Sequence, residues 1–406
     1  MKSLAAHAID DQRLPQSKRE VVGALVVGGD YQGLGIVRSL GRHGIPICVV
    51  DDEHSIARFS KYTTYAVGGV ELRDEIRAVD ALLEIGNRLG LKGWILYPTR
   101  DETVAALSRY RDRLAEFFRV PTPEWNTIQW AWNKWNTYRL AESLNIPTPK
   151  MWSAASISEL RSLDITFPIA IKPAIKEHFF YATKAKAWRA DSWEQLEELF
   201  ARATKQVGSE EVIVQELIPG DGRQQFAYCG FFKQKTCSAD VIVRRTRQHP
   251  REFGRASTFV ETSDVPALKE YSERFLSAIN YYGLVEIEYK LDSRDGQYKL
   301  LDVNARTWGY HSLGYGAGVD FPYLLFADQL GISVKHRPVR QDVSWVRLTT
   351  DIPTGILEIL AGNLSWKDYL RSLRRANVEA VFSREDPLPG IVELALIPYL
   401  LVHRGY

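Results

Sequence analysis

Short apolar runs alternate with helical spacing in the first third of the chain. Residues 21–27 form an apolar run that ends in two glycines, helical spacing of apolar positions begins at Ile36, and a second apolar run covers residues 46–50. A third run covers residues 94–97 and is followed by polar residues. Strands separated by a helix in this way are typical of a parallel α/β sheet. The pattern therefore predicts an α/β N-terminal domain over residues 21–120, with ligands at the carboxyl ends of its strands.

The pattern changes after Pro121 and Pro123, which mark a linker, to strands with intervening helices. From residue 334 onward, short strands and a basic helix around 369–375 carry no motif that indicates a function. In chain order, the middle of the sequence predicts a helix over 133–144, a strand over 167–173, a helix over 192–204, a strand over 211–217, a hairpin over 228–243, a helix over 265–282 and strands over 284–291 and 298–303.

A cluster of acidic side chains lies on the last two predicted strands. Turn residues 292–296 separate these strands, which makes them an antiparallel hairpin. Because strand side chains alternate between faces, Glu286 and Glu288 share one face, and so do Asp302 and Asn304. An ordinary solvated face of charged residues is the alternative interpretation of this pattern.

Carboxylates on neighbouring strands repel one another unless a cation lies between them. Magnesium takes octahedral oxygen ligation, usually from one or two carboxylates together with phosphate oxygens and waters. An Asp-x-Asn pair beside a glutamate supplies part of such a shell. Arg306, two residues after Asn304, could then pair with a phosphate oxygen through its planar guanidinium.

At this hairpin the sequence resembles the ATP-grasp superfamily, and in particular its carboxylate–amine ligase branch. The family's magnesium motif is an acidic residue on one strand, followed across a turn by a Glu/Asp-x-Asn pair and an arginine. The resemblance implies that Glu288, Asp302 and Asn304 are metal ligands, with Glu286 as the rival of Glu288. It also implies that Arg306 is the catalytic residue, which would stabilise the developing oxyanion.

Two lysines upstream extend the resemblance in the expected order. Lys134 begins a predicted helix, and Lys172 ends the apolar strand 167–173. In the family, lysines at these places reach the phosphates of ATP. An unpaired ammonium in an apolar strand would be costly, which favours a functional role for Lys172. Lys134 is equally consistent with an ordinary lysine at a helix start.

Residues 212–220 resemble the hinge between the two grasping subdomains of the family. The resemblance implies that the backbone of Glu216, Leu217 and Ile218 meets adenine and that Asp221 accepts from the ribose hydroxyls. The Glu216 carboxylate or carbonyl would accept from the adenine amino group. An edge strand that ends in a Pro-Gly turn is the alternative.

Residues 174–181 depart from the family pattern, and the basic run 244–251 has two possible interpretations. Many ATP-grasp lids hold phosphates with a glycine-rich loop, but residues 174–181 contain no glycine. Their phosphate contacts are left unassigned, with Lys176, Lys184 and Lys186 nearby. The basic run 244–251 could line the site where an acyl phosphate forms, or it could be a solvated strand end.

Glycines at residues 28–35 invite a dinucleotide interpretation, with Asp51 as the ribose acceptor. Their order differs from the GxGxxG fingerprint. The resemblance implies instead a Rossmann-like domain that holds substrate. The residues expected to face the acceptor substrate are Asp30, Arg100 and Asp101. Arg255, which follows the basic run, is a further possible substrate residue.

Composition narrows the class of protein. Of the 406 residues, 45% are hydrophobic and 25% charged, and the net charge is +2, which fits a soluble globular protein and argues against disorder and against nucleic-acid binding. Three scattered cysteines exclude a disulfide framework. Residues 1–20 lack a secretory signal, and the apolar stretch 388–402 is shorter than the ~20 residues of a spanning helix. That stretch is expected to dock on the protein body, with peripheral membrane contact as the weaker alternative, in a cytoplasmic enzyme.

We therefore predict a mixed α/β and α+β chain. It comprises a flexible tail (1–20), a Rossmann-like pre-ATP-grasp domain (21–120), a two-subdomain ATP-grasp fold (121–332, with a lid at about 148–217) and an extension of unknown role (333–406). The predicted function is an ATP-dependent ligase that joins a small-molecule carboxylate to an amine through an acyl phosphate. Its cofactors would be ATP and two Mg²⁺ ions, or Mn²⁺ in their place, and a homodimer is a family expectation. The alternatives are an ATP-grasp carboxylase or kinase and, from another class, an NAD(P)-dependent reductase.

Overall fold

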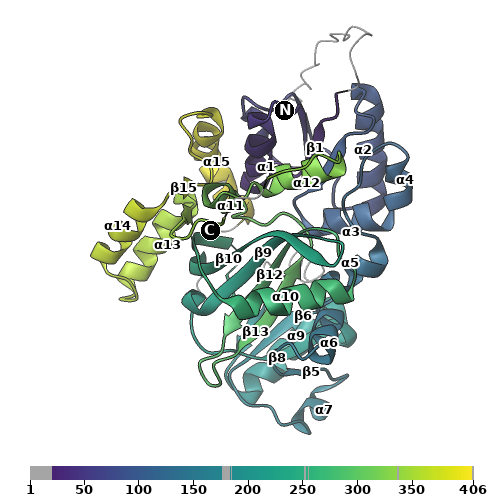
Figure 1. Cartoon of the computed structure of the whole chain (residues 1–406). Coiled ribbons are helices and arrows are strands. Elements are labelled where there is room, and N and C mark those ends of the chain that lie inside the picture. The colour runs from purple at the N-terminus through teal and green to yellow at the C-terminus, as the bar shows by residue number, and fades with distance from the viewer. Residues whose placement is uncertain are drawn as a thin grey trace, which may run out of the picture.

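Three β-sheets organise the described part of the chain (Figure 1). The structure is a computed structural model that describes residues 21–175, 183, 185–250, 253–254, 256–335 and 338–404. The expected tail over residues 1–20, the expected substrate residue Arg255 and most of the glycine-free loop lie outside these residues.

The N-terminal sheet is parallel and has four strands in the order β3-β2-β1-β4. This confirms the predicted strand–turn–helix–strand unit. The turn after β1 depends on Gly28, whose φ of +100° is a conformation that glycine adopts most readily. The elements of this region are β1 (Ala24–Val27), α1 (Tyr31–Arg42), β2 (Ile47–Asp51), η1 (Ala57–Phe59), β3 (Tyr65–Gly68), α2 (Glu75–Leu89), β4 (Ile95–Pro98), α3 (Asp101–Arg109) and α4 (Arg111–Ala115).

The central sheet has seven strands in the order β13-β12-β9-β10-β11-β14-β15 and is antiparallel except between β14 and β15. Two residues with positive φ, Gln234 and Lys235, form the turn of the predicted hairpin between β9 and β10. The strands are β9 (Gln225–Lys233), β10 (Thr236–His249), β11 (Ala256–Thr262), β12 (Gly283–Leu291), β13 (Tyr298–Asn304), β14 (Ser344–Val346) and β15 (Val378–Glu379).

Different partners cover the two faces of the central sheet. On one face, Tyr228, Val285 and Ile287 pack with apolar side chains of three helices. On the other face, Phe231 and Leu284 join a core shared with the N-terminal sheet and the C-terminal segment. The covering helices are α5 (Trp125–Trp132), α6 (Lys134–Ser143) and α10 (Pro266–Ala278) on the first face, with α11 (Ser312–Ala317) and α12 (Phe321–Gln329) near the second.

The helix predicted over 265–282 is shorter than expected. Helix α10 ends at Ala278, and Asn280 has a positive φ of 50°, which a continuing right-handed helix does not permit. The chain then turns directly into β12.

The third sheet is antiparallel, with four strands in the order β5-β8-β6-β7 (Figure 1, below the central sheet). Strand β8 lies inside this sheet, so the edge-strand alternative for residues 212–220 is wrong. Helix α9 buries Leu196 and Phe200 against the strands. The elements are β5 (Met151–Trp152), α7 (Ile157–Arg161), β6 (Ile169–Pro173), β7 (Trp188–Ala190), α9 (Trp193–Val207), η2 (Ser209–Glu211), β8 (Val212–Glu216) and η3 (Gly222–Gln224).

The C-terminal segment returns to the start of the chain. It adds β14 and β15 to the central sheet and three helices, α13 (Leu348–Leu360), α14 (Trp366–Arg375) and α15 (Leu388–Arg404). The buried Arg38 of α1 donates to Asp386 at 3.0 Å and to the carbonyl of Val381 at 2.7 Å. Within the described ranges, no helix has the length and apolar character needed to cross a membrane.

Candidate active site

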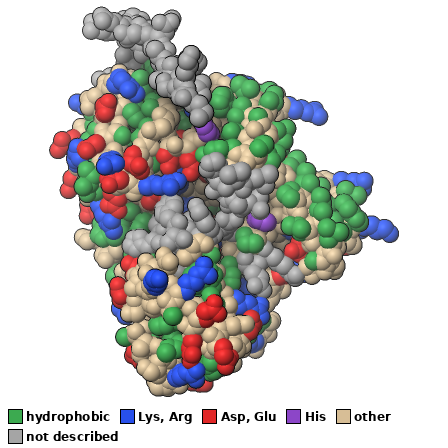
Figure 2. Space-filling model, turned by 180° about the vertical axis from the view of Figure 1, so that it is seen from behind, with side chains coloured by type: hydrophobic (Ala, Val, Ile, Leu, Met, Phe, Trp, Pro, Cys, Tyr) green, Lys and Arg blue, Asp and Glu red, His purple; other side chains and the backbone are tan. Residues whose placement is uncertain are grey.

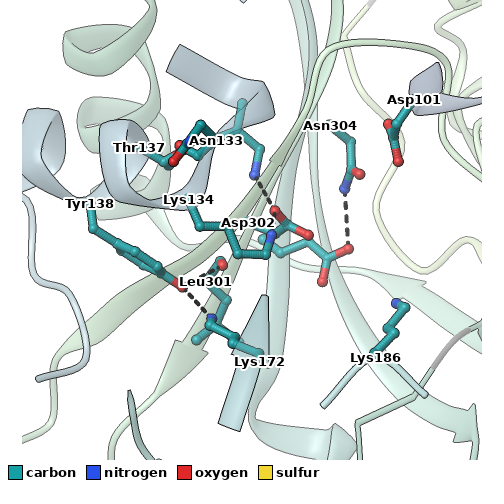
Figure 3. Close-up of polar contacts among 12 residues, drawn as sticks. Asp101, Asn133, Lys134, Thr137, Tyr138, Lys172, Lys186, Leu301, Asp302 and Asn304 are labelled. Carbon is teal, nitrogen blue, oxygen red and sulfur yellow. Dashed lines mark hydrogen bonds and ion pairs between the residues drawn. The ribbon is translucent and has the colours of Figure 1, made fainter. Parts of the chain in front are cut away.

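A cleft of about 1020 Å³ separates the small sheet from strands β12 and β13 of the central sheet. Side chains from both sheets and from the start of α6 face it (Figure 3). The predicted residues that line this cleft are Lys134, Lys172, Glu216, Leu217, Ile218, Asp221, Glu288 and Asp302.

The acidic residues pair directly across the hairpin. Glu288 lies opposite Asp302, and Glu286 lies opposite Asn304. The predicted shared face is therefore confirmed. The two pairs differ in access, because Glu288 and Asp302 line the cleft while Glu286 is only 3% exposed. Glu286 accepts hydrogen bonds from the Tyr310 hydroxyl and, at 3.0 Å, from the Asn304 amide.

Cationic side chains hold both carboxylates that face the cleft. Lys134 Nζ pairs with Asp302, and an Arg245 guanidinium nitrogen lies 2.9 Å from Glu288. Arg245 lies two strands away from Glu288, and the small side chain of Ala227 on the intervening strand leaves room for the contact. A register shift after Arg245 sends Arg247 away from the cleft to Asp351.

Charge and burial shift the pKa values of Glu286 and Glu288 in opposite directions. Burial acts to raise the pKa of Glu288, but the neighbouring Arg245 and Lys186 cations hold it below its usual value. Burial and the nearby Glu288 charge raise the pKa of Glu286 to about 7. Glu288 is therefore the ionised member of the pair near neutral pH, which favours it over Glu286 as a metal ligand.

The donor set of the hairpin fits magnesium. Among the described residues, no three Asp, Glu, His or Cys side chains surround a common point. Proteins usually bind Mg²⁺ through only one or two carboxylates, and phosphate oxygens and waters complete its coordination. Two opposed carboxylates with a nearby amide oxygen are enough for such a site. The hard oxygen donors of Glu288, Asp302 and Asn304 suit such a cation.

Lys172 lies in a small hydrogen-bond network at the base of the cleft. Its ammonium donates to the Tyr138 hydroxyl at 2.7 Å, which in turn donates to the carbonyl of Leu301 at 2.7 Å (Figure 3). Gln215 also donates to Tyr138, at 3.2 Å. Burial and the nearby Lys134 ammonium lower the pKa of Lys172 to about 7, against the partial compensation of Asp302 and Glu288. The Lys172 amine would therefore gain a proton when a ligand brings further negative charge into the cleft.

We expect nucleotide binding to be coupled to proton uptake at Lys172. About one pH unit above its pKa the free protein holds most of Lys172 neutral, and a bound polyphosphate favours the ammonium and raises that pKa. Titration calorimetry of ATP in buffers of different ionisation enthalpy should show uptake approaching one proton. About one unit below the pKa the uptake should vanish, because Lys172 is already charged. The variant Lys172→Met is the control, and uptake that persists in it would contradict the assignment.

Hydrogen bonds fix the predicted hinge segment, residues 212–220, in place. The Glu216 carboxylate accepts from the Lys150 N–H at 2.9 Å, from Arg294 at 2.8 Å and from Lys299 at 3.2 Å. Since this carboxylate is engaged by three donors, the backbone of the hinge is the better candidate for an adenine contact. Asp221 caps η3 and holds Arg223 at 2.8 Å, and its side chain also reaches the cleft.

Lys290 anchors the next turn of the hinge. Its buried ammonium donates to the carbonyls of Ile218, at 2.8 Å, and Gly220, at 2.7 Å. The variant Lys290→Met would leave two carbonyls without this donor and loosen the segment. We expect the KM for ATP to rise about tenfold, equivalent to ~1.4 kcal/mol, with a smaller change in kcat. Steady-state kinetics over an ATP series would measure this, and a fall in kcat at unchanged KM would contradict it.

The predicted catalytic arginine does not line the main cleft, but it binds residues that line a smaller cavity beside it. Arg306 binds Asp101 through two nitrogens, at 2.6 and 3.0 Å, and donates to Asn304 at 3.1 Å. Asp101, Asn304, Lys134 and Asp302 line this side cavity, so it adjoins the cleft through the last two residues. The structure thus joins Arg306 to a residue that the sequence placed near the acceptor substrate.

The other N-terminal candidates take part in local contacts. Asp30 caps α1 by accepting from the Gln32 N–H at 3.0 Å. Arg100 pairs with Asp51 at 2.9 Å and with Asp52 at 2.6 Å. Asp51 is 2% exposed and also accepts from the Gly29 N–H, so it is poorly placed to receive the ribose of a dinucleotide.

Several contributors to the cleft escaped sequence reasoning. Arg245 was visible only as part of a basic run, and strand alternation alone does not choose between Arg244 and Arg245. Tyr138 and Lys290 gave a weak signal, because each stands among several other polar residues of its predicted element. Lys186, which the sequence placed near the glycine-free loop without assigning a contact, lines the cleft, and its ammonium donates to the Gly254 carbonyl at 2.9 Å.

Comparisons with known proteins agree with this geometry. Residues 231–351, which include the acidic hairpin, match the family described as ATP-grasp in the biosynthetic pathway with Ter operon. The chain is 23% identical over 307 residues to a D-aspartate ligase of Enterococcus faecium (strain Aus0004), covering 70% of each protein.

Solved structures share the same fold. An L-amino acid ligase from Bacillus licheniformis superposes with a TM-score of 0.60 at 17% identity, covering 81% of this chain and 79% of that one. The biotin carboxylase domain of a 2-oxoglutarate carboxylase from Hydrogenobacter thermophilus, solved with MgADP, ADP and bicarbonate, gives a TM-score of 0.62 at 12% identity, covering 80% and 74%.

Proposed function

We propose that this chain, which has the ATP-grasp fold, is an ATP-dependent ligase that joins a carboxylate to an amine. The reaction would proceed through an acyl phosphate and release ADP and phosphate. One observation carries the proposal: Lys134 and Lys172 reach the same cleft as the directly opposed carboxylates Glu288 and Asp302. Ammonium groups on separate elements can share the charge of a triphosphate and orient it.

The nucleotide would lie along the cleft between the two sheets. Adenine would contact the backbone of residues 216–218, and Asp221 would accept from the ribose hydroxyls. The phosphates would reach Lys134 and Lys172. Positioning and charge neutralisation carry most of the catalysis in such a reaction, so a nucleophilic Ser or Cys is not required.

Glu288, Asp302 and Asn304 are the residues that would hold divalent metal, proposed as two Mg²⁺ ions. When bound, the metal neutralises phosphate charge during transfer of the γ-phosphoryl group. Lys134 and Arg245 occupy these carboxylates in the structure described here. Both cations would therefore have to turn toward the phosphates when nucleotide and metal bind.

The acceptor would approach from the N-terminal domain. Arg306 would stabilise the oxyanion that develops when an amine attacks the acyl phosphate, and Asp101 holds its guanidinium in place. Asp30, Arg100 and Asp101 are proposed to face the substrates, because they follow the carboxyl ends of β1 and β4. We also propose that the protein is cytoplasmic and forms a homodimer.

Phosphate release measured with pairs of compounds tests this function. ADP release should require both a carboxylate and an amine, and D-aspartate and other amino acids are the first compounds to try, given the relatives described above. Turnover with bicarbonate in place of the carboxylate would instead support a carboxylase. Thermal stabilisation by NADH but not by ATP with Mg²⁺ would favour the reductase and overturn the proposal.

A further inference from the structure

Helix α13 buries its polar side and exposes its apolar side. Its buried side carries polar or small residues, Asp351, Thr354 and Gly355. Its exposed side carries large apolar residues, of which Leu357 is 57% and Leu360 79% exposed. A surface helix normally buries its apolar stripe and exposes its polar one.

Specific contacts hold α13 in this orientation. Arg247 binds the fully buried Asp351 through two nitrogens, at 2.9 and 2.8 Å. The ring of Tyr369 on α14 packs so closely on Gly355 that an added Cβ would lie 2.4 Å from it. A rotation of α13 that buried its leucines would break the ion pair and this close contact.

Helix α15, which contacts the start of α13, likewise buries a charged residue and exposes apolar ones. Its buried Glu393 accepts from Arg347 at 2.6 Å and from Thr349 at 2.7 Å, two residues at the start of α13. Its outer side carries Ile391, which is 61% exposed, and Leu394. These bonds tie α15 to the start of α13.

Helix α14 borders this surface with positive charge. Trp366 and Leu370 are exposed, and the helix carries four basic residues against one acidic residue. Helical spacing places Lys367, Arg371 and Arg374 on the side next to the exposed Trp366 and Leu370. Figure 2 shows hydrophobic side chains gathered over α13, α14 and α15, with Lys and Arg side chains at the outer edge.

We propose that this C-terminal face, formed by the exposed sides of α13, α14 and α15, docks on the surface of an anionic lipid bilayer. An apolar helix face flanked by Lys, Arg and Trp is the arrangement that lies in the interface plane of a membrane, with apolar groups in the headgroup–acyl boundary and cations on anionic lipid. Such a bilayer supplies both an apolar layer and negative charge. A second copy of the chain would meet the face with the same positive border.

Flotation with lipid vesicles tests the proposal on the full-length protein. The wild type should float with vesicles of equimolar phosphatidylcholine and phosphatidylglycerol, and less so as salt rises. The double variant Leu357→Ser, Leu360→Ser and the double variant Arg371→Glu, Arg374→Glu should each lower the partition coefficient by about tenfold or more. These residues are exposed, so the fold should survive, which circular dichroism would verify.

Matched controls come from a distant helix. Ile76 and Arg77 are exposed on α2, and Ile76→Ser and Arg77→Glu should leave vesicle binding unchanged. Absence of flotation, or flotation that none of the C-terminal variants reduces, would overturn the proposal. A dimer in light scattering that the leucine variant dissociates, without vesicle binding, would assign the face to a second copy and also overturn it. None of these readouts depends on ligase activity.

Discussion

The variant Asp302→Asn should lose ATP turnover by about a thousandfold or more. The substitution keeps the size of the side chain but removes the negative charge that lies opposite Glu288. Metal held at such a pair supplies several kcal/mol of charge stabilisation, and each ~1.4 kcal/mol corresponds to a factor of ten in rate. ADP release under saturating substrates is the measurement, with MgATP binding by calorimetry to show that the cleft has formed.

Neighbouring acids of the same hairpin provide the comparison. Asp295 lies in the exposed turn, and Asp295→Asn should retain turnover within about twofold. Glu288→Gln should resemble Asp302→Asn, whereas Glu286→Gln should cost less, since its carboxylate is turned toward Tyr310 and Asn304. If Asp302→Asn retained turnover within about threefold of the wild type, the metal assignment would be wrong.

The variant Asp386→Ala should destabilise the protein by about 3–5 kcal/mol. Asp386 is 2% exposed and accepts from Arg38 at 3.0 Å, from the Ser60 hydroxyl at 2.8 Å and from the Lys61 N–H at 2.9 Å. Its loss would leave a buried guanidinium without its counter-charge, which is among the costlier single changes in a core. Urea unfolding followed by fluorescence would measure the change.

The adjacent residue is the control for this prediction. Glu385 pairs with Arg42 at 3.3 Å, and its side chain is 48% exposed. Exposed ion pairs contribute up to about 1 kcal/mol, so Glu385→Ala should change the free energy of unfolding by less than that. Equal effects of the two variants would show that Arg38 finds another partner or that water reaches it.

The acidic hairpin could be predicted from sequence because its signals are local. Strand alternation places Glu286 and Glu288 together, the turn at 292–296 sets the register, and both are properties of neighbouring residues. The order of Lys134, Lys172 and the hinge along the chain then supplied the family resemblance. Most predicted elements agree with the structure to within a few residues, but a left-handed residue, Asn280, ends α10 early, β10 continues past the predicted end at residue 243 to His249, and strand β11 was not predicted.

The contacts that complete the cleft depend on strand order and on distant segments. Arg245 reaches Glu288 only because β9, with Ala227, lies between β10 and β12. The bidentate pair of Arg306 with Asp101 joins residues 205 positions apart. The sequence predicted a role for each partner separately, but no periodicity indicates that they meet.

The C-terminal face illustrates another case, in which the sequence pattern correctly indicated that a segment packs on the protein body but not which of its residues are buried. The apolar stretch 388–402 was expected to pack on the protein body. Val392 and Leu396 of α15 do pack against the core, but Glu393 is buried beside them, where it accepts a charge-assisted hydrogen bond from the buried Arg347, and Leu394 is exposed.

The contact between Arg38 and Asp386 has a consequence for synthesis on the ribosome. The two residues are separated by 348 positions, so at common elongation rates roughly 20 to 70 seconds pass between their translation. During that time the N-terminal domain has emerged while Arg38 still lacks its counter-charge. The segment around Asp386, which is made long after the N-terminal residues, therefore closes this surface, and a nascent chain arrested before Asp386 should leave it open to proteases and chaperones.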